Sequence, residues 1–191
     1  GRESYLPAAA TTTFLAGLDD RSAAEVQRVE LVFPAPALQR VTLVDTPGLN
    51  AIGAEPELTV NLLPQAHAVV FILAADTGVT KSDLSIWRDH LAVEPDQADS
   101  RLVVLNKIDT LWDSLSTPEQ VQAQIERQRQ TSADILNLPS ERVIPVSAQK
   151  GLVAKVTNDT GLLMASQLPM LELALGRDML GKRQRILRAA V

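Results

Sequence analysis

The sequence contains no cysteine and few aromatic residues. Of its 191 residues, none is cysteine and only 3% are aromatic. The absence of cysteine excludes disulfide bonds, thiolate zinc sites and cysteine nucleophiles. With so few aromatic side chains, the core must consist of Leu, Val, Ile and Ala. The hydrophobic fraction of 46% is enough for one core of ordinary size.

Long apolar runs and an excess of basic residues are also missing. The longest apolar run, residues 66–75, has about half the ~20 residues that a membrane-spanning helix needs. We therefore interpret it as a buried strand. The net charge is -5 and the pI is about 5.1, which argues against a chain that mainly neutralises nucleic-acid phosphates. We expect no nucleic-acid partner.

Short apolar runs alternate with helical patterns along the chain. Strands are expected at residues 26–33, 40–45, 68–75, 101–106 and 142–146, and helices at 55–66, 80–92, 117–136 and from residue 152 onward. This order predicts an α/β fold with a mostly parallel sheet and helices on both faces, followed by a C-terminal helical segment. Such sheets bind ligands beyond the carboxyl ends of their strands.

The first motif, Asp45-Thr46-Pro47-Gly48, follows the strand expected at 40–45. A carboxylate at a strand end can hold the Mg²⁺ shell of a bound triphosphate, usually through water. A glycine three residues later lets its backbone N–H approach the γ-phosphate. A tight turn with an Asx hydrogen bond is the alternative interpretation.

The second motif, Asn106-Lys107-Ile108-Asp109, follows the strand expected at 101–106. Guanine presents two donors on one edge, N1–H and the exocyclic amino group, and a single carboxylate accepts both. Asp109 would therefore select guanine over adenine. The stem of Lys107 can lie over the base, and Asn106 can tie neighbouring loops together. A polar exit from the strand is the alternative.

The third motif, Ser147-Ala148, follows the last expected strand. A backbone N–H here would donate to guanine O6, and small residues let the loop approach the ring. The dipeptide alone carries little information. Three motifs in this order, each at a strand end, together predict a guanine-nucleotide site.

These motifs resemble the phosphate-sensing and base-recognition motifs of P-loop GTPases. The segment VDTPGLN, with EPELTVNLLPQAHAVVFILAADTGVTKSDLSIWRDHL after it, more narrowly resembles the bacterial dynamin-like GTPases. The resemblance covers roughly residues 40–191. It implies a GTPase domain at 1–167 and a helix leading to a neck or stalk at 168–191. It also implies GTP/GDP and Mg²⁺ as ligands, with Asp45, Gly48 and Thr46 at the phosphates and metal.

The resemblance further implies GTP hydrolysis coupled to membrane remodelling. Two GTPase domains associate across the nucleotide in this family, and regions outside this sequence contact an anionic membrane. A cytoplasmic protein, peripheral to the membrane, is expected. Thr13, in a Thr-rich segment, is the candidate for the switch threonine that binds Mg²⁺ and positions water, with an ordinary loop as the alternative.

A phosphate-binding loop of the form G-x-x-x-x-G-K-S/T does not precede Asp45. Gly176 to Lys182 has the Gly and Lys spacing, but Arg183 replaces the Ser or Thr that binds Mg²⁺. We interpret it as a helix segment. We expect that the chain starts after the loop or that its sequence omits stretches, and that on its own it binds triphosphate poorly and is inactive.

Two other functions remain open at this stage. One is a ribosome-assembly GTPase with the same base motifs, although the acidic pI and the lack of an RNA-binding module count against it. The other is a scaffold that dimerises without hydrolysing nucleotide.

Overall fold

The computed structural model of the chain describes residues 43–46, 63, 66, 68–92, 101–113 and 115–177. The chain divides into two compact units, Gly1–Thr46 and Pro47–Val191. In the first unit only residues 43–46 are described, and they have no regular secondary structure. The strand expected at 40–45 is therefore wrong over residues 43–45, where Leu43 is 73% exposed. β-branched residues favour a strand only where a neighbour pairs with them and covers them.

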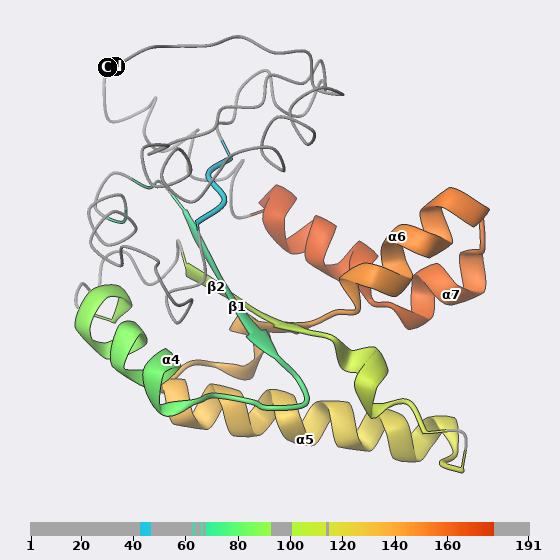
Figure 1. Cartoon of the computed structure of the whole chain (residues 1–191), viewed down its shortest axis with the longest axis horizontal. Coiled ribbons are helices and arrows are strands. Elements are labelled where there is room, and N and C mark those ends of the chain that lie inside the picture. The colour runs from blue at the N-terminus through green and yellow to red at the C-terminus, as the bar shows by residue number, and fades with distance from the viewer. Residues whose placement is uncertain are drawn as a thin grey trace, which may run out of the picture. The chain divides into compact units, whose positions relative to one another are not determined.

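The described sheet belongs to the second unit and has three parallel strands in the order β1-β2-β3 (Figure 1). They are β1 (Val69–Ala74), β2 (Arg101–Asn106) and β3 (Val143–Pro145). The register runs from Val69 opposite Arg101 to Ala74 opposite Asn106. This confirms the predicted α/β class with a parallel sheet. It also brings the carboxyl ends of β1 and β2 to the same edge.

Burial differs between the strands. The first five residues of the central strand β2 are buried, as its apolar sequence predicts. The apolar run at 66–75 was expected to form a buried strand, but Ile72 in β1 is 63% exposed. Alternate side chains of a strand point to opposite faces, and Leu73, next to Ile72, is only 3% exposed. The described residues therefore cover one face of β1 more completely than the other.

Two helical segments cover that buried face. The first consists of α4 (Lys81–Ile86) and the π-helical turn η3 (Trp87–Leu91), and the second is α5 (Pro118–Leu136). Figure 1 shows α4 and α5 on the same side of the strands. The core that they form with the sheet contains Leu73, Trp87, Leu91, Val103, Leu105, Ile108, Ile125, Ala133, Leu136 and Val143.

Capping boxes fix where both helices begin. The Thr80 hydroxyl accepts a hydrogen bond from the Asp83 backbone N–H, and the Asp83 carboxylate accepts one from the Thr80 N–H. Thr117 and Gln120 form the same pair before α5, and Pro118 occupies its first position. These pairs satisfy N–H groups that have no partner within the helix. The predicted start at Thr117 is confirmed.

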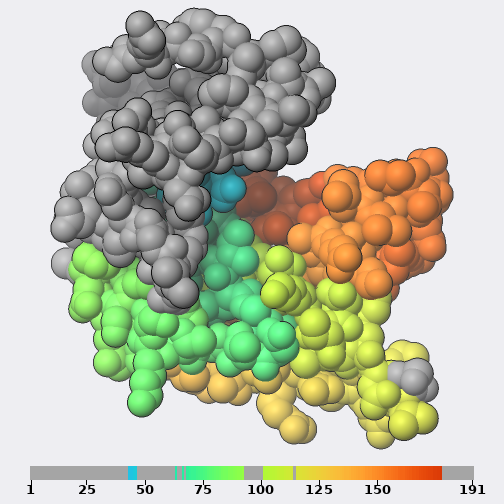
Figure 2. Space-filling model, viewed as in Figure 1, coloured from blue at the N-terminus to red at the C-terminus, as the bar shows by residue number. Residues whose placement is uncertain are grey.

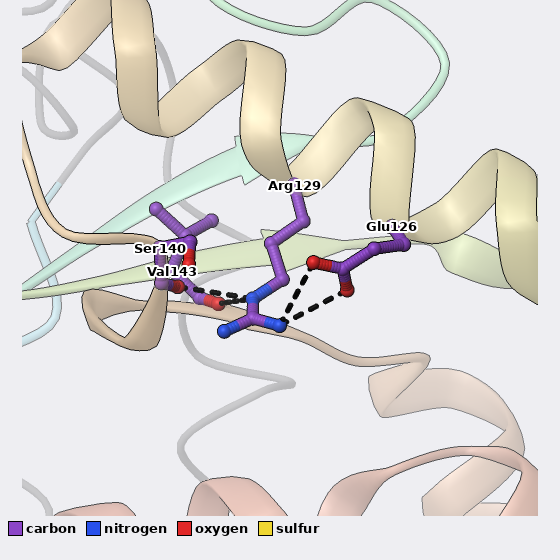
Figure 3. Close-up of polar contacts among 4 residues, drawn as sticks. All are labelled: Glu126, Arg129, Ser140 and Val143. Atoms are coloured by element: carbon purple, nitrogen blue, oxygen red, sulfur yellow. Dashed lines mark hydrogen bonds and ion pairs between the residues drawn. The ribbon is translucent and has the colours of Figure 1, made fainter.

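Arg129 connects α5 to the segment that leads into β3. Its Nε donates to the Ser140 carbonyl at 3.0 Å and to the Val143 carbonyl at 3.1 Å (Figure 3). Ser140 begins the short helix η6 (Ser140–Arg142), which directly precedes β3. The guanidinium also pairs with Glu126 on the same helix. One side chain thus satisfies the carbonyl of the first residue of β3 and a carbonyl of the short helix before it.

After β3 the chain is helical, and the helices begin earlier than expected. The first, α6 (Ala148–Thr157), starts four residues before the predicted position at 152, because Ser147 caps it and accepts from the Lys150 N–H. Next come α7 (Thr160–Ala165) and helical residues 168–177. The first two residues of the Gly176–Lys182 segment, Gly176 and Arg177, are helical.

The surface of α6 and α7 is coloured orange in Figure 2. Several of its apolar side chains are exposed, among them Leu152, Val156 and Met164. Gln167, with a φ of 57°, separates α7 from the helical residues after it. The predicted boundary between domains 1–167 and 168–191 falls at this turn and stays a prediction. Among the described residues, no helix is both long and apolar enough to cross a membrane.

Candidate functional site

The loop after β2 contains the second sequence motif. Lys107 adopts the left-handed conformation, with a φ of 65°, and its side chain is exposed. The Lys107 carbonyl accepts from the Thr110 N–H at 3.0 Å and from the Thr110 hydroxyl at 2.7 Å. Ile108 is fully buried and begins the short helix η5 (Ile108–Leu111). Burial of Ile108 anchors the loop, which turns Lys107 outward and leaves Asp109 partly buried.

The loop after β3 lies next to the loop after β2, because backbone pairing continues beyond the ends of these two strands. The Val146 N–H donates to the Leu105 carbonyl at 2.9 Å, and the Ile108 N–H donates to the Val146 carbonyl at 3.3 Å. Ser147 follows and is fully buried, whereas Ala148 is exposed. The second and third motifs are therefore neighbours although about forty residues separate them in the sequence.

Two side chains join these loops. Asn106 Oδ1 accepts from the Lys107 N–H at 2.7 Å and from the Ala148 N–H at 3.1 Å. The Ser147 hydroxyl donates to Asp109 Oδ1 at 2.6 Å. The structure thus brings together all five residues predicted for base recognition. Hydrogen bonds to a charged acceptor are roughly twice as strong as neutral ones, so the Ser147 bond orients the Asp109 carboxylate.

The Asp109 carboxylate in this arrangement can still accept hydrogen bonds from a ligand. An ionised carboxylate has about four lone-pair sites, and Ser147 uses only one oxygen of Asp109. The carboxylate can therefore still accept from a pair of donors on a ligand. The sequence suggested a backbone N–H at Ser147-Ala148 as a donor to the base, and here the Ala148 N–H donates to Asn106 Oδ1.

One residue of this arrangement was missed by sequence reasoning. The backbone N–H of Ser147 donates to the carbonyl of Ser166 at 2.8 Å, and Ser166 is fully buried. Ser166 lies in no motif. A serine between two helical patterns gave no signal that its carbonyl would support a loop nineteen residues earlier in the chain.

The residues predicted at the phosphates lie in the first unit or outside the described residues. Asp45 and Thr46 are described and exposed, and both belong to the first unit. Thr13 and Gly48 fall outside the described residues. Within the ranges that the structure describes, no three His, Cys, Asp or Glu side chains gather into a group that could hold a metal ion.

A family model and one relative each match most of the chain. Residues 21–178 match the family model of the elongation factor Tu GTP binding domain. A probable transmembrane GTPase, FZO-like and chloroplastic, from Arabidopsis thaliana is 31% identical over 166 residues, which are 82% of this chain and 17% of that protein. Dynamin-like protein 2 of Campylobacter jejuni is 29% identical over 87 residues, 46% of this chain and 14% of its own length.

The chain therefore spans less than a fifth of the length of these two relatives. Among solved structures, Aquifex aeolicus Era, a variant bound to GDP and AlF4⁻, matches with a TM-score of 0.33 and 23% identity. The match covers 53% of this chain and 31% of the Era chain.

Proposed function

Because the chain belongs to the family of the elongation factor Tu GTP binding domain, we propose that it recognises guanine through the loops after β2 and β3 and takes part in GTP hydrolysis. The observation that carries this proposal is the pair of bonds between the loops. Asn106 joins Lys107 to Ala148, and Ser147 holds Asp109. Because these bonds hold the two loops together, a ligand that contacts one loop also lies next to the other.

In this proposal each residue has a separate task. The Asp109 carboxylate accepts N1–H and the amino group of guanine in a fork, which adenine cannot offer. The exposed stem of Lys107 lies over the plane of the base. Asn106 fixes the spacing of the loops, and the Ala148 N–H, shared with Asn106 Oδ1, would donate to guanine O6. The left-handed backbone of Lys107 costs of order 1–3 kcal/mol. Hydrogen bonds from the Thr110 hydroxyl to the Lys107 carbonyl and from the Lys107 N–H to Asn106 Oδ1 offset this cost.

For hydrolysis we propose in-line attack of water on the γ-phosphate. Asp45 and Thr13 would hold Mg²⁺, Thr46 would contact the nucleotide, and the Gly48 backbone N–H would donate to the γ-phosphate. Carboxylate and hydroxyl oxygens are the hard donors that Mg²⁺ prefers, and the exposed carboxylate of Asp45 suits this role. When bound, the ion neutralises charge that develops on the phosphates.

Replacing Asp109 by Asn tests the base contact. Xanthine has a carbonyl where guanine has its amino group, so an amide side chain matches xanthine better than a carboxylate does. For the full-length protein we expect Asp109→Asn to weaken GTP binding about a hundredfold, because Asn keeps one acceptor oxygen but removes one charge-assisted hydrogen bond to guanine, worth about 1.5–3 kcal/mol. XTP should then bind more tightly than GTP.

The matched control is Asp113→Asn. Asp113 is exposed close to the same loop, and its Oδ1 accepts from the Leu115 N–H, a bond that Asn can also make. The control should keep the wild-type preference for GTP over ATP and XTP. Equal affinity of the wild type for GTP and ATP would refute guanine recognition. An unchanged GTP affinity in Asp109→Asn would refute the role of this residue.

We further propose that hydrolysis is coupled to membrane remodelling, with GTPase domains that associate with each other on the cytoplasmic face of a membrane. The support is the similarity to an FZO-like transmembrane GTPase and to a dynamin-like protein. The membrane contact would come from regions outside this chain. GTP turnover by the full-length protein should rise several-fold on anionic vesicles but not on neutral ones. Equal turnover with both would refute the coupling.

A further inference from the structure

Ser166 lies at the turn between α7 and the helical residues 168–177, and it is fully buried. Its hydroxyl donates to the Leu163 carbonyl at 2.6 Å and accepts from the Leu168 N–H at 3.2 Å. Its carbonyl accepts from the Ser147 N–H at 2.8 Å. The Ser166 hydroxyl thus fixes the turn. The Ser166 carbonyl, which belongs to the same turn, holds the backbone N–H of Ser147.

Gly151 in α6 allows this turn to approach. A Cβ at Gly151 would lie 2.7 Å from Leu168 Cδ2, 2.8 Å from Leu168 Cβ and 3.1 Å from Ser166 Oγ. Real Cβ atoms essentially never show contacts under 3.0 Å, and a packed interior absorbs such an overlap only by shifting. The glycine is therefore required by the close approach of residues 166–168 to α6.

All polar groups of Ser147 have partners in this arrangement. Its N–H donates to Ser166, its carbonyl accepts from the Gly151 N–H at 2.9 Å, and its hydroxyl is shared between Asp109 and the Lys150 N–H. Ser147 therefore cannot follow a shift of the turn without weakening at least one of these bonds. Its hydroxyl donates to the carboxylate proposed to read guanine.

We propose that Gly151 and Ser166 are positioning residues for guanine selectivity: their contact holds Ser147 in place, and Ser147 aligns the Asp109 carboxylate with the two donors of guanine. This inference rests on the proposed function, since it concerns the same base site. It extends that site to a turn that has no recognisable nucleotide motif.

The selectivity between two related bases distinguishes a loss of alignment of the Asp109 carboxylate from a general weakening of the fold. Inosine has N1–H but lacks the exocyclic amino group, so the ratio of the Kd for IDP to the Kd for GDP measures the second bond to the carboxylate. In the full-length protein, Gly151→Ala and Ser166→Ala should each lower this ratio by about tenfold, which corresponds to about 1.4 kcal/mol. A variant that merely weakens the fold would change both affinities alike and leave the ratio unaltered.

Gly161→Ala is the matched control. A Cβ at Gly161, in α7, meets only Asp159 Oδ1 at an ordinary 3.5 Å. Its ratio should equal that of the wild type. If Gly151→Ala does not fold, Ser166→Ala still tests the proposal, because it removes the hydroxyl that fixes the turn without adding an atom. A wild-type ratio in folded Gly151→Ala or in Ser166→Ala overturns the proposal.

Hydrogen exchange in the nucleotide-free protein provides a readout that does not depend on the proposed function. The Ser147 amide should exchange at least about tenfold faster in Gly151→Ala and Ser166→Ala than in the wild type or Gly161→Ala. Unchanged exchange at Ser147 would overturn the positioning role even if the wild type binds GDP. A wild type without preference for GDP would overturn the proposed function, and the exchange rates would still decide whether the turn holds Ser147.

Discussion

Replacing Asn106 by Ala removes the side chain that joins the two candidate base-binding loops. The change takes away one acceptor that serves two backbone donors, the N–H of Lys107 at 2.7 Å and the N–H of Ala148 at 3.1 Å. A hydrogen bond contributes about 0.5–1.5 kcal/mol net, so two contribute about 1–3 kcal/mol. Both donor residues are exposed, so water can form hydrogen bonds with their N–H groups and recover part of this free energy. We expect a loss of about 1–2 kcal/mol in the free energy of unfolding.

The effect on nucleotide binding should be larger than stability alone explains. At about 2–4 °C per kcal/mol for a chain of this size, the Tm should fall by about 2–8 °C. The Kd for GDP should rise by about tenfold or more, because Lys107 and Ala148 lose their common support. Urea unfolding and calorimetric titration with GDP measure the two quantities on the same sample.

Asn137→Ala is the control with a matched loss of stability. Asn137 caps the C-terminus of α5 in the left-handed conformation, with a φ of 54°. An alanine is strained there by roughly 1–2 kcal/mol. Asn137 is exposed and belongs to neither of the two candidate base-binding loops. The control should therefore unfold about as easily as Asn106→Ala and bind GDP like the wild type. Equal GDP affinities of Asn106→Ala and Asn137→Ala would refute the reasoning.

Elements with strong local signals could be predicted from the sequence. The apolar run at 101–106 matches β2 residue for residue. Thr117, Pro118 and Gln120 fix the start of α5 because a capping box depends only on residues close in sequence. The meeting of the second and third motifs also follows from the sequence, since parallel strands place their carboxyl ends at one edge.

Features that depend on distant contacts could not be predicted. The apolar sequence of β1 did not reveal that Ile72 is exposed, because exposure depends on which elements cover each face. Ser147 was expected only as a small residue in a loop that approaches the base, whereas its hydroxyl caps α6 and also donates to Asp109. The support from Ser166 involves a backbone carbonyl, an atom that every residue has, so its identity gave no clue.

Two further predictions concern hydrolysis and stability. Asp45→Ala should lower GTP turnover at saturating GTP by about a hundredfold while leaving the preference for GTP over ATP intact, because in the proposed site different residues would hold the metal and the base. Unchanged phosphate release would contradict the proposed role of this carboxylate. Arg129→Lys should lower the free energy of unfolding by about 1–3 kcal/mol. An ammonium group lacks the planar fork that bonds the Ser140 and Val143 carbonyls while pairing with Glu126. Arg127→Lys, an exposed change on the same helix, should unfold like the wild type in urea. Coincident unfolding curves for the two lysine variants would show that Arg129 contributes only its charge, and that the start of β3 does not depend on its bonds.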